Sequence, residues 1–348
     1  MTYMKTMTSR ERVQRCLCFD HPDRPPRDLW LLPSTALHHG QETVEAFRQR
    51  WPADICQVPG CRPAPRKTAG DPYAVGTATD EWGCVFENVL PGVHGEVKHP
   101  LLEDWVRLED LAPPEELLAV DTAAVNAFCR DQERYVFASG WARPFERMQF
   151  LRGTENLFYD FAEEGPELQA LIDLVHDFYR RQYEIWATTE VDALVMMDDW
   201  GSQISLLISP DQWRRLFKPL YAEYATIAHD HGKAFFMHSD GCIQDIYPDL
   251  VEIGIDAVNS QLFCMDFDRL AATAKDHLTF WGEIDRQHIL PHGSPQEVRQ
   301  AVEKVYDTLH DPAGGVIAQF SWEGATPLAN AEAVYEAWEA LTTHTTPS

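Results

Sequence analysis

The sequence predicts an α/β protein folded as a (β/α)8 TIM barrel, and three observations lead to this prediction. Eight segments have the pattern of short strands, and each is followed by a segment with the pattern of a helix. The later strand candidates are continuous apolar runs, typical of a parallel sheet covered on both faces. The first candidate ends in Leu32-Pro33-Ser34-Thr35. A doubly wound open sheet, the main alternative, favours a glycine-rich turn there.

The elements follow in order from local signals. The first helix is expected from Ser9 to about Cys18, and His21-Pro22-Asp23-Arg24-Pro25-Pro26 then leads the chain on in extended form. Later helices begin at Ser209-Pro210 and Ser294-Pro295, where serine and proline occupy the cap and first-turn positions. The strand candidates are residues 28–32, 54–58, 135–139, 193–197, 234–237, 257–262, 278–282 and 315–320. The longer helix candidates are residues 43–50, 122–130, 166–188, 210–231, 243–253, 267–274, 295–310 and 329–341.

One region interrupts this alternation. Residues 61–120 are rich in turn residues and aromatic side chains. Within them, residues 85–90 and 93–97 are expected to pair as a β-hairpin across Pro91-Gly92. We therefore expect a single barrel domain over residues 1–348, with a hairpin-bearing insertion after the second strand.

Composition restricts the partners. The formal net charge of -26 opposes binding to nucleic acid or to an anionic membrane surface. The sequence has no apolar run long enough to span a membrane and no apolar core of a signal peptide near its start. The eight cysteines are scattered without a C-x-x-C pair, as in reduced proteins, so a cytoplasmic location is expected.

The barrel prediction selects the candidate site residues, because active sites of this fold lie at the carboxyl ends of the strands. Polar side chains near the expected strand ends should therefore lie together at the carboxyl-terminal opening of the barrel, here called the mouth. Aromatic side chains are expected to line it. The polar residues are Asp54, Arg143, Arg147, Asp198, Asp199, His238, Asp240, Asn259, Gln261, Glu283, Asp285 and His288, with Trp30 and Trp200 among the aromatics. So many carboxyl groups in one place require a metal, a cationic partner or nearby arginines.

The segment His238-Ser239-Asp240-Gly241-Cys242 suggests a metal site. Zinc accepts nitrogen, oxygen and sulfur ligands, so His238, Asp240 and Cys242 could bind it together with Glu283. The alternative is that His238 and Asp240 hydrogen-bond each other and a substrate without a metal, with Cys242 facing away.

Other candidates have both functional and structural interpretations. Only one of Asp198 and Asp199 can point inward as a general acid or base, and the other would cap the following turn. Asp285 and His288 are catalytic candidates, or ion-pair partners around Arg286.

The remaining candidates are the arginines, one early aspartate and the tryptophans. Arg143 and Arg147 could bind a substrate carboxylate. Asp54 is a catalytic candidate or the cap of a loop, and most of the tryptophans are expected in the core.

Several of these segments together resemble the uroporphyrinogen decarboxylase superfamily. They are Thr8-Ser9-Arg10-Glu11-Arg12-Val13, His21-Pro22-Asp23-Arg24-Pro25-Pro26, Met197-Asp198-Asp199-Trp200-Gly201, Phe217-Lys218-Pro219-Leu220, His238-Ser239-Asp240-Gly241, Gly282-Glu283-Ile284-Asp285 and Gly314-Gly315-Val316-Ile317. The resemblance implies a (β/α)8 barrel, in agreement with the strand count, and one of two chemistries.

The first implied chemistry is decarboxylation. Asp54 matches the position of the family's aspartate. The arginine-rich motif of the first strand, which binds porphyrin carboxylates, is replaced by Arg27-Asp28-Leu29-Trp30. The family's catalytic tyrosine falls at Phe150 and its late histidine near Trp322.

The second implied chemistry is methyl transfer with a corrinoid (cobalamin) carried by a partner protein. Such relatives bind zinc through a His-x-Cys pair and a late cysteine. Here His238 matches, Asp240 replaces the first cysteine, and the late cysteine is missing. A harder ligand set suits an oxygen-bearing or amine substrate.

We therefore expect a methyltransferase that moves a methyl group between a small molecule and a corrinoid protein, as a monomer or homodimer. The alternatives are a decarboxylase or lyase acting on a porphyrinogen-like or smaller acid, and a non-catalytic ligand-binding barrel.

Overall fold

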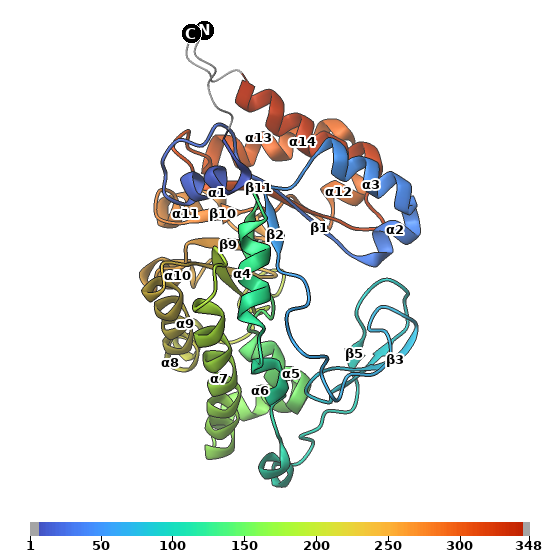
Figure 1. Ribbon diagram of the computed structural model, residues 1–348, viewed down its shortest axis with the longest axis vertical. Coiled ribbons are helices and arrows are strands. Elements are labelled where there is room, and N and C mark those ends of the chain that lie inside the picture. The colour runs from blue at the N-terminus through green and yellow to red at the C-terminus, as the bar shows by residue number, and fades with distance from the viewer. Residues whose placement is uncertain (1–6, 344–348) are drawn as a thin grey trace.

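The computed structural model describes residues 7–343 and contains a barrel of eight parallel strands (Figure 1). The strand order is β1-β11-β10-β9-β8-β7-β6-β2. These strands are β1 Arg27–Leu31, β2 Ile55–Gln57, β6 Tyr135–Phe137, β7 Ala193–Met197, β8 Ala234–Ser239, β9 Ala257–Ser260, β10 Thr279–Trp281 and β11 Val316–Trp322. The predicted (β/α)8 fold and all eight strand positions are confirmed.

The barrel closes between its first and last strands in the pairing order, β1 and β2. The backbone N–H of Asp54 donates to the carbonyl of Arg27 at 2.8 Å. The Asp54 carboxylate in turn accepts the Arg27 N–H at 2.7 Å. The side chain of Asp54 therefore takes the place of a ladder bond where the short strand β2 begins.

Helices surround the strands. They are α1 Ser9–Leu17, α2 Pro33–His39, α3 Gln41–Arg50, α4 Thr122–Arg130, α5 Pro144–Arg152, α6 Thr154–Glu163, α7 Pro166–Ala187, α8 Pro210–Leu216, α9 Lys218–Asp230, α10 Tyr247–Glu252, α11 Phe267–Ala274, α12 Ile289–His292, α13 Pro295–Leu309 and α14 Leu328–Thr343. Short 3-10 helices cover η1 Trp105–Asp110, η2 Glu115–Leu118 and η3 Leu262–Cys264. The segment 210–231, expected as one helix, divides at Phe217 because Pro219 occupies the first turn of α9 and has no backbone N–H to donate.

The insertion after β2 forms a separate three-stranded antiparallel sheet on the side of α2 (Figure 1). Its strands are β3 Gly76–Thr79, β4 Val85–Asn88 and β5 Glu96–Val97. The expected hairpin is confirmed, because Phe86 pairs with Val97 and Glu87 with Glu96. A third strand, which the sequence pattern did not predict, pairs with the other edge of β4.

Large aromatic side chains fill the interior of the barrel. Phe137, Phe236 and Trp281 are fully or almost fully buried there, and the half-buried rings of Trp30 and Trp141 pack against them. Such dense packing is typical of a TIM-barrel core, and it leaves the chemistry to the strand ends. None of the helices in the described residues is long and apolar enough to cross a membrane.

Helix α1 covers the amino-terminal ends of the strands. Arg10 N–H donates to the Glu133 carbonyl just before β6. Asp54 lies at this end, buried in ion pairs with Arg12 at 2.6 Å and Arg24 at 2.8 Å. The expectation that Asp54 lies at the catalytic mouth is wrong, because the residue precedes β2 instead of following it. Burial alone would raise the pKa of Asp54, but the charge and hydrogen bond of Arg24 outweigh it and lower the pKa.

Replacing Asp54 with asparagine should therefore destabilise the fold. The change leaves two arginines without their buried counter-charge, which costs about 3 kcal/mol in comparable buried pairs. Urea unfolding at neutral pH measures the loss, and Asp245→Asn, which removes an exposed partner of Arg269, is the matched control with an expected loss under about 1 kcal/mol.

The difference between wild type and Asp54→Asn should also depend on pH. A carboxyl group with a lowered pKa stabilises the fold above its unfolded pKa near 3.8, and this stabilisation disappears as the pH falls through the folded value. Equal losses in the Asp54 and Asp245 variants would show that the buried cluster adds nothing to stability.

Candidate functional site

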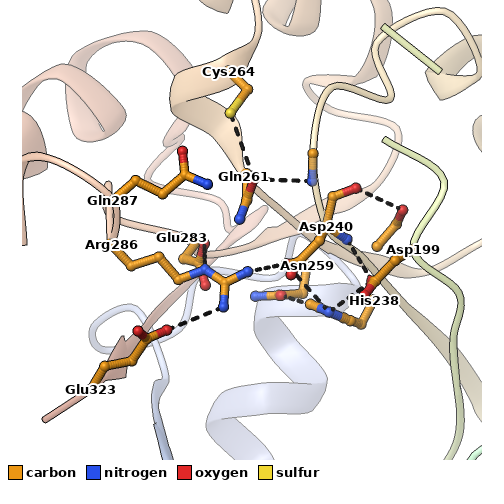
Figure 2. Close-up of polar contacts among 12 residues, drawn as sticks. Asp199, His238, Asp240, Asn259, Gln261, Cys264, Glu283, Arg286, Gln287 and Glu323 are labelled. Carbon is orange, nitrogen blue, oxygen red and sulfur yellow. Dashed lines mark hydrogen bonds and ion pairs between the residues drawn. The ribbon is translucent and has the colours of Figure 1, made fainter. Parts of the chain in front are cut away.

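Polar side chains from five neighbouring strands meet at the opposite end of the barrel (Figure 2). The strands run parallel, so their carboxyl ends share one rim. The group comprises Asp199 after β7, His238 and Asp240 at the end of β8, Asn259 on β9, Glu283 and Arg286 after β10, and Glu323 after β11.

His238 is buried, and Asn259 holds its ring in place. Nδ1 of His238 lies 2.6 Å from Oδ1 of Asn259. The Asn259 amide nitrogen donates to the Trp281 carbonyl and to Oε1 of Gln319, so the remaining oxygen must act as an acceptor. His238 therefore carries a proton on Nδ1 and presents Nε2 to the other polar groups.

Two carboxylates surround Nε2 of His238. Asp199 Oδ1 lies 3.4 Å away and Asp240 Oδ1 lies 3.5 Å away. The Asp240 backbone N–H also donates to Asp199 at 2.9 Å, which holds both residues together. Burial alone would lower the pKa of His238, but these carboxylates outweigh it and raise the pKa to about 9. The same interaction lowers the pKa of Asp199.

Arg286 links three carboxyl groups across the mouth. Its guanidinium forms ion pairs with Asp240, with Glu283 at 3.3 Å and with Glu323 at 3.3 Å. Glu283 is buried, and its Oε1 atom has no hydrogen-bond partner among residues 7–343. Burial raises the pKa of Glu283 to about 7 in spite of the Arg286 charge. Glu283 is thus poised between its neutral and charged forms near neutral pH.

Sequence reasoning missed Glu146, which belongs to the electrostatic environment of the site. It lies in the first turn of α5, and its Oε2 atom is buried without a hydrogen-bond partner in the described part of the chain. Burial raises the pKa of Glu146 to about 7, with Arg143 acting in the opposite direction and Asp199 in the same one. The nearest signal in the sequence is its position shortly after the third barrel strand.

Asp198 and Asp199 point in different directions. Asp198 accepts the backbone N–H groups of Phe145 and Glu146 at 3.0 and 2.9 Å, and also the hydroxyl proton of Tyr221. Asp198 thereby holds the amino end of α5, while Asp199 lies beside His238. As candidate acid or base, only Asp199 reaches the mouth.

Tryptophan rings form the floor beneath His238. The Trp30 ring centroid lies 5.0 Å from that of His238 and 5.1 Å from that of Trp281. Asp28 accepts the indole N–H groups of Trp30 and Trp281 at 2.9 and 2.8 Å. Burial raises the pKa of Asp28 to about 6. This carboxyl group orients the aromatic floor.

Two expected substrate-binding residues are engaged elsewhere. Arg147 is buried and paired with Asp80 and Glu81 of the insertion, so it is not available to a substrate carboxylate. Trp200 stacks on Phe145 at 3.9 Å and is fully buried in the core. Both corrections have one cause: these side chains face the packing between elements and not the mouth.

Asp285 and His288 form an ion pair with each other, with 3.6 Å between Oδ2 and Nδ1, which agrees with the structural interpretation of these residues. Asp285 accepts the backbone N–H groups of Gln287 and His288, each at 2.9 Å, and so orders the turn before α12. The His288 side chain is largely exposed. It is Arg286, between them, that enters the site.

The other four expected substrate-binding residues lie near the mouth: Asn259 and Trp30 beside His238, and also Arg143 and Gln261. Arg143 is half-buried beside Glu146 and contacts the Met197 sulfur. Gln261 is buried and accepts the Gly241 N–H through its side-chain oxygen.

The residues can accommodate a divalent metal, with a different ligand set from the expected one. Donor atoms of Asp199, His238 and Asp240 all lie within 4.8 Å of one another. Zinc accepts such nitrogen and oxygen donors, and metal-bound histidines commonly donate their second ring N–H to an oxygen, as His238 does to Asn259. Cys242 is outside this group; burial raises the pKa of its thiol, which disfavours a thiolate ligand. Glu283 is outside it as well and pairs with Arg286.

Replacing Asp199 with asparagine should lower the pKa of His238 from about 9 towards the ordinary value of 6.5, because one counter-charge is lost. The imidazole signals in NMR spectra of EDTA-treated protein report this pKa. Asp285→Asn is the control, because Asp285 contacts the turn and not His238.

The same raised pKa has a consequence for stability. The imidazolium stabilises the fold fully below pH 6.5, and this contribution disappears as the pH rises through about 9. An unchanged His238 titration in Asp199→Asn would contradict the assigned role of Asp199.

Comparisons with known proteins place this site in context. The family model for uroporphyrinogen decarboxylase (URO-D) matches residues 82–341. Among solved structures, a methyltransferase from Methanosarcina mazei aligns with a TM-score of 0.67 and 15% identity, covering 96% of this chain and 99% of that chain. At this identity the likeness shows a shared fold.

A more distant structural match is the 3-keto-D-glucoside 4-epimerase YcjR from E. coli, with a TM-score of 0.37, 14% identity and coverage of 70% of this chain and 95% of that chain. That score is too low to bear on function. No curated protein matches the chain. The URO-D model extends over well more than half of the sequence and takes in the strands that carry Asp199, His238 and Glu283, and the chain therefore belongs to the uroporphyrinogen decarboxylase (URO-D) family.

Proposed function

We propose that this protein is a methyltransferase that moves a methyl group between a small, oxygen-bearing substrate and the corrinoid of a separate protein. The observation that supports the proposal best is the excess of carboxyl groups over cationic side chains at the mouth. Among the described residues, carboxyl groups outnumber cations there, since Glu146, Asp199, Asp240, Glu283 and Glu323 interact with Arg143, His238 and Arg286, and Arg147, which also acts on Glu146, is paired with two further carboxylates. Such a site suits an uncharged substrate better than a polycarboxylate.

The first strand supports this choice. Arg27 points away from the barrel interior, with its guanidinium over the rings of Trp51 at 4.8 Å and Tyr335 at 5.7 Å. The inward residue Asp28 adds another carboxyl group beneath the mouth. A tetra-acidic porphyrinogen would meet repulsion where a decarboxylase needs arginines. The placement of Asp54 at the far end also removes the feature that favoured decarboxylation.

The residues of the site are arranged for proton transfer to a leaving oxygen. With a pKa of about 9, His238 is protonated at neutral pH and can donate its Nε2 proton when the bond between oxygen and methyl breaks. Asn259 fixes the ring orientation, and Asp199 and Asp240 stabilise the imidazolium. A corrinoid, when bound at the mouth, would supply the nucleophile that accepts the methyl group.

A metal would give the same site a second way to activate oxygen. Asp199, His238 and Asp240 would hold zinc, which would act there as a Lewis acid towards the substrate oxygen. In that state, His238 would be a neutral ligand that keeps its proton on Nδ1 and donates it in a hydrogen bond to Oδ1 of Asn259.

Methyl transfer can be measured with free cob(I)alamin and a panel of methyl ethers and methylated amines, from the absorbance change on methylation. We expect His238→Ala to reduce the rate about 10²- to 10⁴-fold, the usual effect of losing a general acid. His277→Ala is the control, because His277 is exposed in the loop before β10.

The same preparations should be tested for carbon dioxide release from uroporphyrinogen and from smaller acids. Release of carbon dioxide without methyl transfer would support a decarboxylase. Ligand binding that survives in His238→Ala, with neither reaction, would support a non-catalytic barrel.

Metal content provides a test that does not depend on activity. After incubation with zinc and dialysis, elemental analysis should find about one zinc per chain in wild type, in keeping with a three-ligand site. The metal should be lost in Asp199→Asn and His238→Ala and retained in Cys242→Ser. Loss in the Cys242 variant with retention in the Asp199 variant would contradict this ligand set.

A further inference from the structure

A small open depression adjoins the His238 group and has no part in the proposed proton transfer. Its lining combines the apolar residues Leu262, Phe263 and Ile284 with the polar residues Gln261, Cys264, Glu283, Asp285, Arg286 and Gln287. These residues follow β9 and β10, so the depression lies on the same rim as His238. A substrate whose methyl group is near His238 could extend into it.

Two side-chain amides supply hydrogen-bond donors to this depression. The oxygen of Gln261 accepts the Gly241 N–H at 3.1 Å, which leaves its amide nitrogen for other partners. Neither that nitrogen nor the Gln287 side chain bonds another of the described residues, and Figure 2 shows the Gln287 nitrogen directed towards Gln261. An acceptor oxygen between them would satisfy both.

Glu283 supplies a buried carboxyl group with one unsatisfied oxygen. Its side chain is 3% exposed, and Oε1 has no hydrogen-bond partner in residues 7–343, while Oε2 lies 3.3 Å from Arg286 Nε. An unpaired buried polar atom is costly unless a ligand or water satisfies it. Because burial favours the neutral acid, Glu283 can both donate and accept a hydrogen bond.

The charge around the depression disfavours an ionic ligand group. Asp240 and Glu323 already share the positive charge of Arg286, so an incoming carboxylate would gain little from it. A cation would gain from the carboxylates but could not satisfy the donors of Gln261 and Gln287. An uncharged group with an acceptor oxygen satisfies the donors without adding charge.

We propose that this depression is a substrate-binding subsite for an uncharged carboxamide-like group, held by Glu283, Gln261 and Gln287. The inference rests on the proposed function and names its substrate class: a methyl donor with a neutral carbonyl group away from the reacting methyl. A neutral carboxyl group and a carboxamide each offer one donor beside one acceptor, so they can pair through two hydrogen bonds.

Direct binding of small probes tests the subsite. Acetamide, acetate and methylammonium are titrated against the protein, with saturation-transfer NMR as the readout. Acetamide should bind best, and Glu283→Gln should keep its affinity, because glutamine preserves the donor and the acceptor. Glu283→Ala and Gln287→Ala should each weaken binding about tenfold, the effect of roughly one lost buried hydrogen bond.

Matched variants keep the test decisive. Gln203→Ala removes an exposed amide next to Cys264 that does not line the depression, and it should leave acetamide binding unchanged. Gln287 is half-buried, so Gln287→Ala remains informative if Glu283→Ala fails to fold.

Three results would overturn the proposal: tighter binding of acetate, methylammonium binding that disappears in Glu283→Gln, or acetamide binding that ignores Gln287→Ala. Because the readout needs neither corrinoid nor methyl transfer, the two proposals fail separately. Methyl transfer without acetamide binding would contradict only the proposed subsite. Acetamide binding without methyl transfer would contradict only the proposed function.

Discussion

The hydrogen bond between Asn259 and His238 is the interaction on which the site depends. Asn259 is held by a carbonyl on β10 and a side-chain amide on β11, and it passes this constraint to a ring on β8. Four adjacent strands therefore determine which nitrogen of His238 is presented at the mouth. Such fixed polar networks in a buried setting limit the reorganisation needed during a reaction.

Many carboxyl groups lie around that fixed ring at the mouth, and few cations balance their negative charge. His238 and Arg286 each lie between carboxylates, and burial leaves Glu146 and Glu283 divided between their neutral and charged forms near pH 7. The site can therefore change its charge by proton uptake, by metal binding or by ligand binding. An uncharged methyl donor is compatible with each of these states.

The barrel could be predicted because its strands are continuous apolar runs, a pattern that requires no knowledge of tertiary contacts. The site was harder to predict, because sequence position does not reveal direction. Asp54 was assigned to the wrong end, since a three-residue strand does not show whether a flanking carboxylate precedes or follows it. Arg147 was expected to bind a substrate carboxylate, because its ion-pair partners Asp80 and Glu81 are distant in sequence and could not be identified from it. Glu146 was missed because a glutamate in a first helical turn usually serves the helix.

The neighbours Glu146 and Arg147 connect helix α5 to two different parts of the structure. One carboxyl group interacts electrostatically with the His238 group, while the adjoining guanidinium is clamped to the insertion through Asp80 and Glu81. Both belong to the same helical turn, whose amino end is held by Asp198. Helix α5 therefore joins the insertion to the charges around His238 through two adjacent side chains, so the packing of the insertion helps to determine where the Glu146 carboxyl group lies.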